Sequence, residues 1–533
     1  MKIQNIVFFQ ALLFTAWYST AACQPYTTTV EFESDEYWWG GAVGAGSLMP
    51  YVEPMETFDL AHENRNNQVV PFFLSNKGRY VWSDYPFSFE VGNSRITFTS
   101  QHEKIEVRQG GTTLREAYLT ASKAHFPPTG TIPDPLFFSV PQYNTWIELV
   151  YDQNQKDVLA YAESILKNGF PPGVLMIDDN WQQDYGHFEF SRDRFPNPRS
   201  MVDRLHEMGF KVMLWVCPFV SPDSRAYREL SAQGYLLKER TSNNPAMIHW
   251  WNGVSACFDL TNPAAKVYYV EQLKHLQTEY GIDGFKFDAG DNGFYREEYV
   301  RGMNETALAV DHTLAWASLG LEFPFNEFRA CWKMGGQPLV QRLGDKYYAW
   351  EAVRLLIPEM VAAGLFGYAY ACPDMVGGGE YKSFAGVQAE DFDQRLIVRS
   401  AQTHALMPMM QFSVAPWRIL DTEHLAIVRD AALLHVKFGN YILKYARLAS
   451  ETGEPIVRHM EYAFPNEGFA QCHDQFMLGD DYLVAPVVTK EEMRLVRLPQ
   501  GTWEDENGKR YKGGKSYSVA APLSRLIHFR KTQ

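Results

Sequence analysis

The sequence predicts a multidomain α/β plus β protein, in which a (β/α)8 TIM barrel is flanked by N-terminal and C-terminal β-sandwich domains. Three observations support this prediction. At 533 residues the chain is too long for one small domain. Its middle part alternates short apolar runs with amphipathic segments of helical period. Both ends consist of short alternating runs separated by turn signals.

Residues 1–23 have the pattern of an export signal. Lys2 is followed by an apolar run from Ile6 to Trp17, too short to span a bilayer comfortably, and then by small residues up to Cys23. We therefore expect export to the periplasm or cell surface of a bacterium. Thr20 to Cys23 loosely resembles a lipoprotein box, although Leu is usual at the position of Thr20, so a lipid anchor at Cys23 and simple cleavage both stay open.

The segment 24–138 is predicted to be the N-terminal β-sandwich. Alternating stretches at 95–100 and 104–108 have the period of half-buried strands, and turn signals at 76–78 and 109–111 separate such stretches. A proline-rich stretch near residues 127–135 then marks a boundary.

The segment 139–453 is predicted to be the barrel. Amphipathic helices are expected at 157–167, 201–208 and 264–280. The expected strands are 146–150, 173–177, 211–216 and 284–287, with weaker ones at 323–326, 339–342, 365–369 and 407–410. Eight such units fit a (β/α)8 barrel with inserted loops. A doubly wound sheet is the competing fold, but no glycine-rich phosphate loop follows the first strand.

The segment 454–533 returns to short strands, expected at 482–488, 494–498 and 526–529, with glycine-rich turns between them. It is predicted to form a small β-sandwich.

Composition narrows the class of partner. The net charge is −14 and the sequence has no basic cluster, which argues against nucleic acid or an anionic membrane. Aromatic residues make up 15% of the chain, enough to line a ligand cleft as well as to fill a core. Aromatic walls suit sugar binding, because the C–H faces of a pyranose pack on rings.

The most informative segment is 281–290, a short apolar strand that ends at Asp288. Lys286 and Asp288 share one face of this strand, because alternate side chains point the same way. A nearby cation favours the ionised carboxylate, which can then act as a nucleophile or an electrostatic anchor. A buried Lys–Asp pair that only holds a barrel together is the structural alternative.

Other polar residues also follow predicted strands, where barrel enzymes place their chemistry. They are Asp178 and Asp179, Cys217, Arg329, Asp345 and Asp374, with Trp181, Trp215 and Trp332 nearby. Each one alone could be a helix cap or a salt-bridge partner. Two carboxylates across an aromatic-lined cleft are what glycoside hydrolysis needs. Metal binding is the rival use, weakened because no His lies among these strand ends and no HxH or HExxH spacing occurs.

These residues resemble glycoside hydrolase family 31. The likeness rests on Phe285-Lys-Phe-Asp288, on 341–350 with its Gly-Asp and Trp, and on 190–198, 259–263 and 479–486. The resemblance implies retention of configuration at α-linked sugars, with Asp288 as nucleophile and Asp345 as acid/base. We expect the pKa of Asp345 to be raised by Asp288 and by burial. The remaining substrate-binding candidates are Asp178, Asp179, Asp374, Lys286, Arg329, Trp181, Trp215 and Trp332. No cofactor and no metal are implied.

Two departures from the usual family pattern bear on the sugar. The segment Ile177-Asp-Asp-Asn-Trp181 resembles α-galactosidases of related families, where paired aspartates grip O4 and O6 of galactose. An Arg-x-His usual in α-glucosidases is replaced by Gln411-Phe-Ser413. Both departures, together with the likeness of 372–379, favour the α-galactosidase branch, acting on an oligosaccharide or glycoside. An α-glucosidase or α-xylosidase is the alternative, and a catalytically dead sugar-binding protein is a less favoured third possibility.

Overall fold

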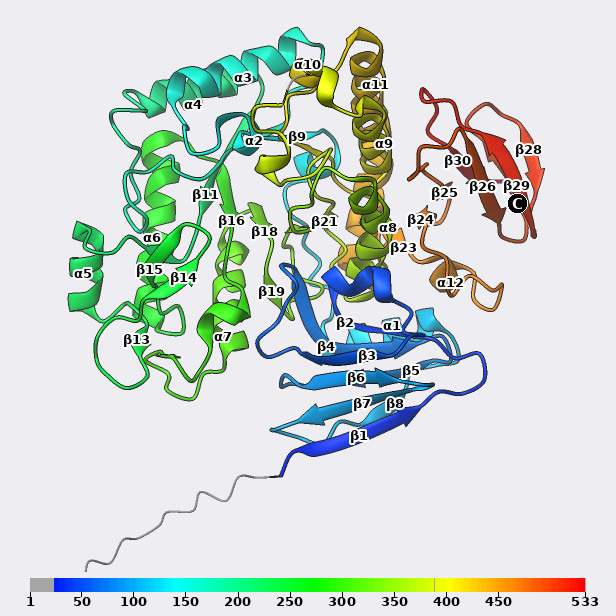
Figure 1. Cartoon of the computed structure of the whole chain (residues 1–533), viewed down its shortest axis with the longest axis horizontal. Coiled ribbons are helices and arrows are strands. Elements are labelled where there is room, and N and C mark those ends of the chain that lie inside the picture. The colour runs from blue at the N-terminus through cyan, green and yellow to red at the C-terminus, as the bar shows by residue number, and fades with distance from the viewer. Residues whose placement is uncertain (1–23, 388, 533) are drawn as a thin grey trace, which may run out of the picture.

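The computed structural model describes residues 24–387 and 389–532 in three parts (Figure 1). The predicted export signal and Cys23 lie outside the described residues. None of the helices in the described part of the chain combines the length and the apolar character needed to cross a membrane.

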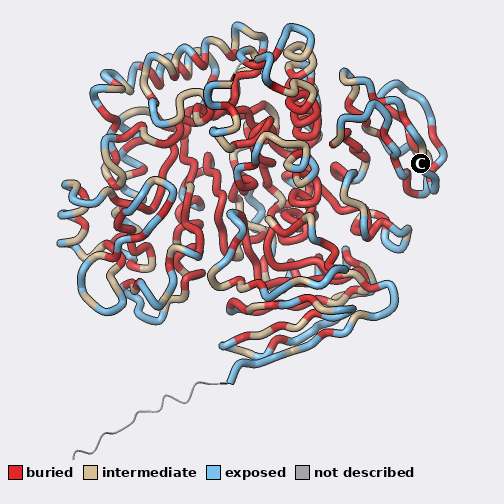
Figure 2. Tube along the Cα trace, viewed as in Figure 1, coloured by how far each residue is buried: buried red, intermediate tan, exposed pale blue. Residues whose placement is uncertain are grey.

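The central part is a parallel eight-stranded barrel, as the sequence predicts. The spatial order is β21-β20-β18-β16-β11-β10-β9-β22, and the Val376 N–H donates to the Gln411 carbonyl at 2.8 Å between its two ends. In chain order the strands are β9 (Gln142–Asn144), β10 (Val174–Ile177), β11 (Lys211–Val216), β16 (Gly284–Phe287), β18 (Phe325–Phe328), β20 (Gln341–Arg342), β21 (Ala371–Cys372) and β22 (Gln411–Phe412). Most of their residues are buried (Figure 2), because helices cover the outside of the barrel and side chains fill its inside.

The predicted first strand, 146–150, is wrong. Residues Trp146–Leu149 form the short helix α2, and the first barrel strand is β9 just before it. A short apolar run does not distinguish a strand from a buried helical turn by its pattern. Here the side chain of Asn144 accepts the Trp146 N–H at 2.7 Å, which favours a turn at the end of β9.

The strands expected at 365–369 and 407–410 are also wrong, because β21 and β22 begin only after these ranges end. Residue 365 instead ends helix α8 (Trp350–Leu365). The expected strands at 323–326 and 339–342 overlap β18 and β20, and those at 173–177, 211–216 and 284–287 coincide closely with β10, β11 and β16.

The barrel helices begin at clear capping residues. The side chains of Asn154, Asn197 and Asn262 accept N–H groups in the first turns of α3 (Gln155–Lys167), α4 (Pro198–Glu207) and α6 (Pro263–Tyr280). Gly281 ends α6 in the left-handed conformation, with φ of 78°. The three predicted helices therefore exist, each beginning one to three residues earlier than expected. Further helices of the barrel part are α5 (Arg225–Gln233), α7 (Ala309–Ala317), α9 (Gln394–Ala405) and α11 (Thr422–Thr452), and α1 (Leu114–His125) belongs to the N-terminal part.

The N-terminal part is built from two antiparallel sheets below the barrel in Figure 1. One contains β1 (Tyr26–Glu31), β7 (Arg95–Ser100), β6 (Ser88–Gly92) and β3 (Met55–Asp59). The other contains β2 (Trp38–Ala42), β4 (Gln68–Ser75), β5 (Arg79–Trp82) and β8 (Val107–Gln109). The Phe73 ring packs edge-on against Phe89 and Phe98, 4.8 and 5.0 Å away between centroids, so aromatic side chains fill the space between the sheets.

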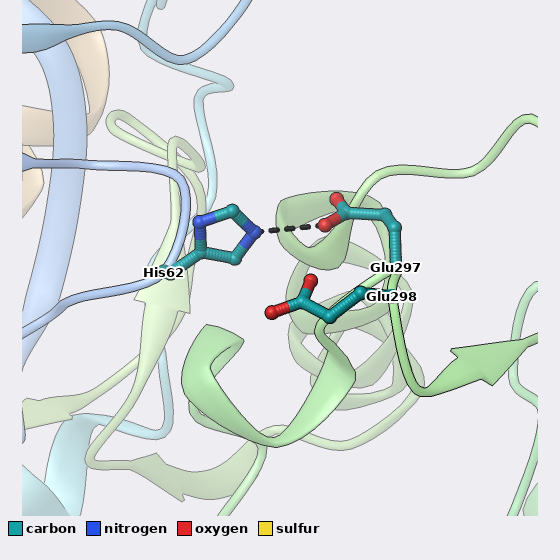
Figure 3. Close-up of side chains that lie close together, drawn as sticks. All are labelled: His62, Glu297 and Glu298. Carbon is teal, nitrogen blue, oxygen red and sulfur yellow. Dashed lines mark hydrogen bonds and ion pairs between the residues drawn. The ribbon is translucent and has the colours of Figure 1, made fainter.

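A strand pairing and a side-chain cluster are among the contacts that join the N-terminal part to the barrel. Strand β19 (Cys331–Trp332), which follows β18, pairs in parallel with β4. In addition, His62 Nε2 lies 2.8 Å from Glu297 Oε2, with Glu298 beside them (Figure 3). The other ring nitrogen, His62 Nδ1, lies 2.9 Å from Asp59 Oδ2. Partial burial lowers the pKa of His62. The hydrogen bonds to Glu297 and Asp59 raise this pKa by more than burial lowers it, so the net shift is upward. We interpret this cluster as an ion-pair contact between the domains, since both ring nitrogens already have carboxylate partners.

The C-terminal part is a β domain to the right of α9 and α11 in Figure 1. Its larger sheet contains β23 (Val457–Arg458), β24 (Phe476–Leu478), β25 (Tyr482–Val484), β30 (His528–Lys531), β27 (Thr502–Asp505) and β28 (Arg510–Lys512). A second sheet pairs β26 (Met493–Leu498) with β29 (Lys515–Ala520). Trp503 and Phe529 are fully buried in its core.

Candidate active site

A pocket of about 400 Å³ lies where the carboxyl ends of the barrel strands meet, within the size range of ligand sites. Most of the residues predicted from strand ends line it: Asp178, Asp179, Trp215, Lys286, Asp288, Arg329 and Asp345. A larger cavity, about 760 Å³, lies between α11 and the C-terminal sheet and holds none of them. The charged pocket is therefore the candidate active site.

Asp288 follows β16 and is held in one orientation by three donors. Its Oδ2 accepts the Trp215 indole N–H at 2.9 Å, and its Oδ1 accepts the Ala289 N–H at 2.8 Å and Arg329 Nε at 3.0 Å. Ala289 has a φ of 58°, an uncommon conformation for alanine that accompanies this backbone donation. Burial raises the pKa of Asp288, but Arg329, Lys286 and Arg342 lower it more, and the net pKa lies well below the usual range. Asp288 is therefore an ionised carboxylate.

Arg329 is itself positioned from the N-terminal part of the chain. Its Nη1 and Nη2 bind the two oxygens of Asp291 at 2.9 and 2.5 Å, and Asp291 accepts the Asn64 amide at 2.7 Å. The Trp251 ring covers the guanidinium, with 5.5 Å between the ring centroid and Cζ. A bidentate pair fixes the plane of an arginine, so Nε is left pointing at Asp288.

Lys286 binds Asp178 rather than Asp288. The Lys286 Nζ lies 2.6 Å from Asp178 Oδ2, which also accepts the Asn144 amide at 2.7 Å. The other oxygen of Asp178 accepts the Asp179 N–H at 2.9 Å. Lys286 therefore does not form the predicted direct pair with Asp288. Its charge still lowers the pKa of Asp288 by electrostatic attraction over a longer distance.

Asp179 keeps more capacity for a ligand. Its Oδ1 accepts the Tyr185 hydroxyl at 3.0 Å and its Oδ2 accepts the Asn252 amide at 2.6 Å. Burial and the neighbouring Asp178 raise the pKa of Asp179 to about 7. Each oxygen of a carboxylate can accept two hydrogen bonds, so one position on each oxygen stays open.

Asp345 follows β20 and lines the same pocket, with 40% of its side chain exposed. Arg342 Nη1 binds Asp345 Oδ1 at 2.7 Å and Asp374 Oδ1 at 3.1 Å, and Arg342 Nε lies 3.3 Å from Glu327 Oε1. The expected upward shift of the Asp345 pKa is wrong. Burial and Asp288 do raise this pKa, but Arg342 and Lys286 lower it more, and the net shift is downward.

Three predicted binding residues do not line the pocket. Trp181 is fully buried and its indole N–H donates to the Trp215 carbonyl at 2.7 Å. Trp332 lies in β19, in the sheet that joins the domains. Asp374 is fully buried and accepts the N–H groups of Met375, Lys346 and Gly379 at 2.7, 2.7 and 3.0 Å. The expectation that these three bind substrate directly is corrected to a supporting role.

Several pocket residues were missed by the sequence reasoning. The hairpin of β14 (Ile248–Trp250) and β15 (Gly253–Cys257) brings Trp251 to the pocket and Asn252 to Asp179. An Asn-Gly pair between two strand-like runs is a hairpin signal that could have found them. Arg342 is buried inside the barrel, and nothing in its local pattern distinguishes it from a surface arginine.

Known proteins similar to this chain include glycoside hydrolases. Residues 140–444 match the family model "Glycosyl hydrolases family 31 TIM-barrel domain", and residues 453–532 match "Glycosyl hydrolase family 31 C-terminal domain". Among curated proteins, the mouse myogenesis-regulating glycosidase is 32% identical over 400 residues, covering 73% of this chain and 55% of its own length. An α-xylosidase of Emericella nidulans is 26% identical over 492 residues, covering 86% of this chain and 60% of its own. The chain thus spans little more than half the length of these relatives.

Solved structures show the same fold. A Flavobacterium johnsoniae GH31 dextranase complexed with glucose matches with a TM-score of 0.84 at 22% identity, covering 95% of this chain and 66% of the other. A GH31 α-xylosidase from a soil metagenome, complexed with xylose, matches with a TM-score of 0.82 at 23% identity, covering 95% and 79%. With the family model spanning more than half of its residues, the chain belongs to glycoside hydrolase family 31.

Proposed function

We propose that the protein is a retaining, exo-acting α-glycoside hydrolase that releases terminal α-galactose. The observation that carries the proposal is one pocket lined by both an ionised, oriented Asp288 and a partly exposed Asp345. Two carboxylates in one sugar-sized site are the groups that a double displacement requires. A catalytically dead sugar-binding protein would not need to keep both.

The mechanism assigns one role to each carboxylate. Asp288 attacks the anomeric carbon, and Asp345 donates its proton to the glycosidic oxygen as the bond to the leaving group breaks. Asp345 then takes a proton from water, which attacks the glycosyl-enzyme and releases the sugar with its original configuration. Arg329 and Trp215 hold Asp288 in line for the first step.

The galactose assignment is supported by Asp179. Asp178 Oδ2 is bound by both Lys286 and Asn144 and its Oδ1 accepts a backbone N–H, whereas each oxygen of Asp179 accepts only one hydrogen bond. Both residues line the pocket, and Asp179 keeps more acceptor positions. Galactose differs from glucose in its axial O4, so discrimination needs a fixed acceptor on that side of the ring. The segment Gln411-Phe-Ser413, which stands where α-glucosidases have Arg-x-His, is fully buried. Other residues must therefore bind the hydroxyl groups that the Arg and His would hold.

An α-glucosidase or α-xylosidase is the second candidate, because α-xylosidases and α-glucosidases are among the named relatives. A panel of aryl α-galactoside, α-glucoside and α-xyloside separates the candidates. We expect the galactoside to have the highest kcat/KM. Faster hydrolysis of the glucoside or xyloside by the wild type would replace galactose with that sugar, and failure to hydrolyse any of the three would leave the sugar-binding alternative.

In the same assay, Asp179→Ala should lower kcat/KM for the galactoside by roughly five- to a hundredfold, since a substrate hydroxyl left without its buried partner costs about 1–3 kcal/mol. Its preference over the glucoside should also narrow. Asp203→Ala, which changes an exposed carboxylate on α4, is the matched control and should leave both values unchanged.

We expect kcat/KM to be highest at acid pH and to fall as the pH rises towards neutrality. Asp345 must carry a proton to act as the acid, and although burial raises its pKa, Arg342 and Lys286 lower it below its ordinary value, so this proton is lost early. The lowered pKa of Asp288 keeps the nucleophile ionised into the acid range. A pH–rate profile measures this, and a kcat/KM that stays maximal up to neutral pH or above it would contradict the assignment of Asp345.

A further inference from the structure

Exposed aromatic side chains gather at the mouth of the pocket. Tyr151, Trp251 and Tyr347 are 41%, 48% and 70% exposed, and all three line it. They come from three separate loops, after β9, between β14 and β15, and after β20. The inner wall is charged, with Asp178, Asp179, Lys286, Asp288 and Arg329. Single exposed aromatics are common on protein surfaces, but three around one charged pocket form a binding surface.

Tyr347 is fixed on the same side of the chain as Asp345. Between them Lys346 is buried, its N–H donates to Asp374 Oδ2 at 2.7 Å, and its Nζ binds Glu359 Oε2 at 2.7 Å. The Lys346 carbonyl also accepts the Glu380 N–H at 3.1 Å. Asp345 and Tyr347, the residues on either side, are both exposed. Because Lys346 is buried between them, the two flanking side chains lie on the open side of this segment.

Within residues 24–387 and 389–532, the Tyr347 hydroxyl makes no hydrogen bond and the Tyr347 ring packs against no other aromatic ring. The neighbouring Tyr348 differs: its hydroxyl donates to the Asp393 carbonyl at 2.5 Å and its ring packs 5.5 Å from Phe384. The loop is therefore held by Lys346 and Tyr348, and Tyr347 is left free to meet a ligand.

Acid catalysis determines which part of the substrate lies there. The acid must lie within hydrogen-bond reach of the glycosidic oxygen, and this oxygen leaves with the second sugar. We propose that Tyr347 is the platform for the leaving-group sugar, so that the substrate is a glycan or oligosaccharide whose second residue packs on this ring. This inference rests on the proposed function. The new element is that the enzyme also recognises the leaving group, which must be a sugar rather than any small alcohol.

The test uses transfer to an added sugar, because an acceptor that intercepts the glycosyl-enzyme must occupy the leaving-group position. The donor is an α-galactosyl fluoride, or the α-glycosyl fluoride that the wild type hydrolyses fastest, and the acceptor is glucose at high concentration. The leaving fluoride is too small to reach Tyr347. The measured quantity is the ratio of transfer product to hydrolysis product, which does not depend on the fraction of folded enzyme.

We expect Tyr347→Ala to lower this ratio about tenfold, which corresponds to about 1.4 kcal/mol. Tyr347→Phe keeps the ring and should keep the ratio. Tyr299→Ala, which removes an equally exposed tyrosine outside the pocket, is the matched control. An unchanged ratio in Tyr347→Ala, or no transfer by the wild type, overturns the inference. Failure of the wild type to release fluoride from any donor would instead overturn the proposed function.

Discussion

Asp288→Ala is expected to lower kcat/KM for an aryl α-galactoside by roughly four orders of magnitude or more, because a covalent route has no substitute for its nucleophile. The fold should survive, since Arg329 keeps its bidentate partner Asp291 when Asp288 is removed. Circular dichroism and thermal unfolding of the variant control for this. Near-wild-type activity in a folded Asp288→Ala protein would remove Asp288 from the mechanism.

Asp345→Ala should affect substrates according to their leaving groups. With an unactivated disaccharide we expect a loss of roughly 10²- to 10⁴-fold, whereas a glycosyl fluoride should react almost normally, because a good leaving group needs no proton. Arg342 keeps Asp374 and Glu327 as partners, so the interior of the barrel should stay intact. The comparison is made as kcat/KM on both substrates with the same enzyme preparation. Losses of equal size would show that Asp345 is not the acid.

The sequence was sufficient to predict the barrel and the residues at the strand ends. Strands such as β10 and β16 are continuous apolar runs, the pattern expected when both faces of a parallel sheet are covered. Because the carboxyl ends of all barrel strands meet at one face, residues far apart in sequence could be expected in one pocket. Asp178, Asp288 and Asp345 do line one pocket.

The incorrect predictions concern features that depend on contacts between distant segments of the chain. Strands β21 and β22 are only two residues long in the structure, too short to carry a period. The direction of the Asp345 pKa shift depends on Arg342, whose guanidinium is shared by three carboxylates that come from different strands. The sequence indicated that Asp345 lies near Asp288, which raises its pKa. It did not indicate that Arg342 binds Asp345 directly and lowers this pKa by more. In the same way, Trp181 and Asp374 have the residue types of a sugar site, yet hydrogen bonds turn both towards the protein.

The central claim is that Asp288 forms a covalent glycosyl-enzyme, and trapping that species tests it most directly. A fluorinated α-galactosyl fluoride that forms the intermediate quickly and releases it slowly should add one sugar to the protein, seen by intact mass. Peptide mapping should then place that sugar on Asp288. A label on another residue, or an active enzyme that accumulates no adduct and first releases the inverted anomer, would contradict the account.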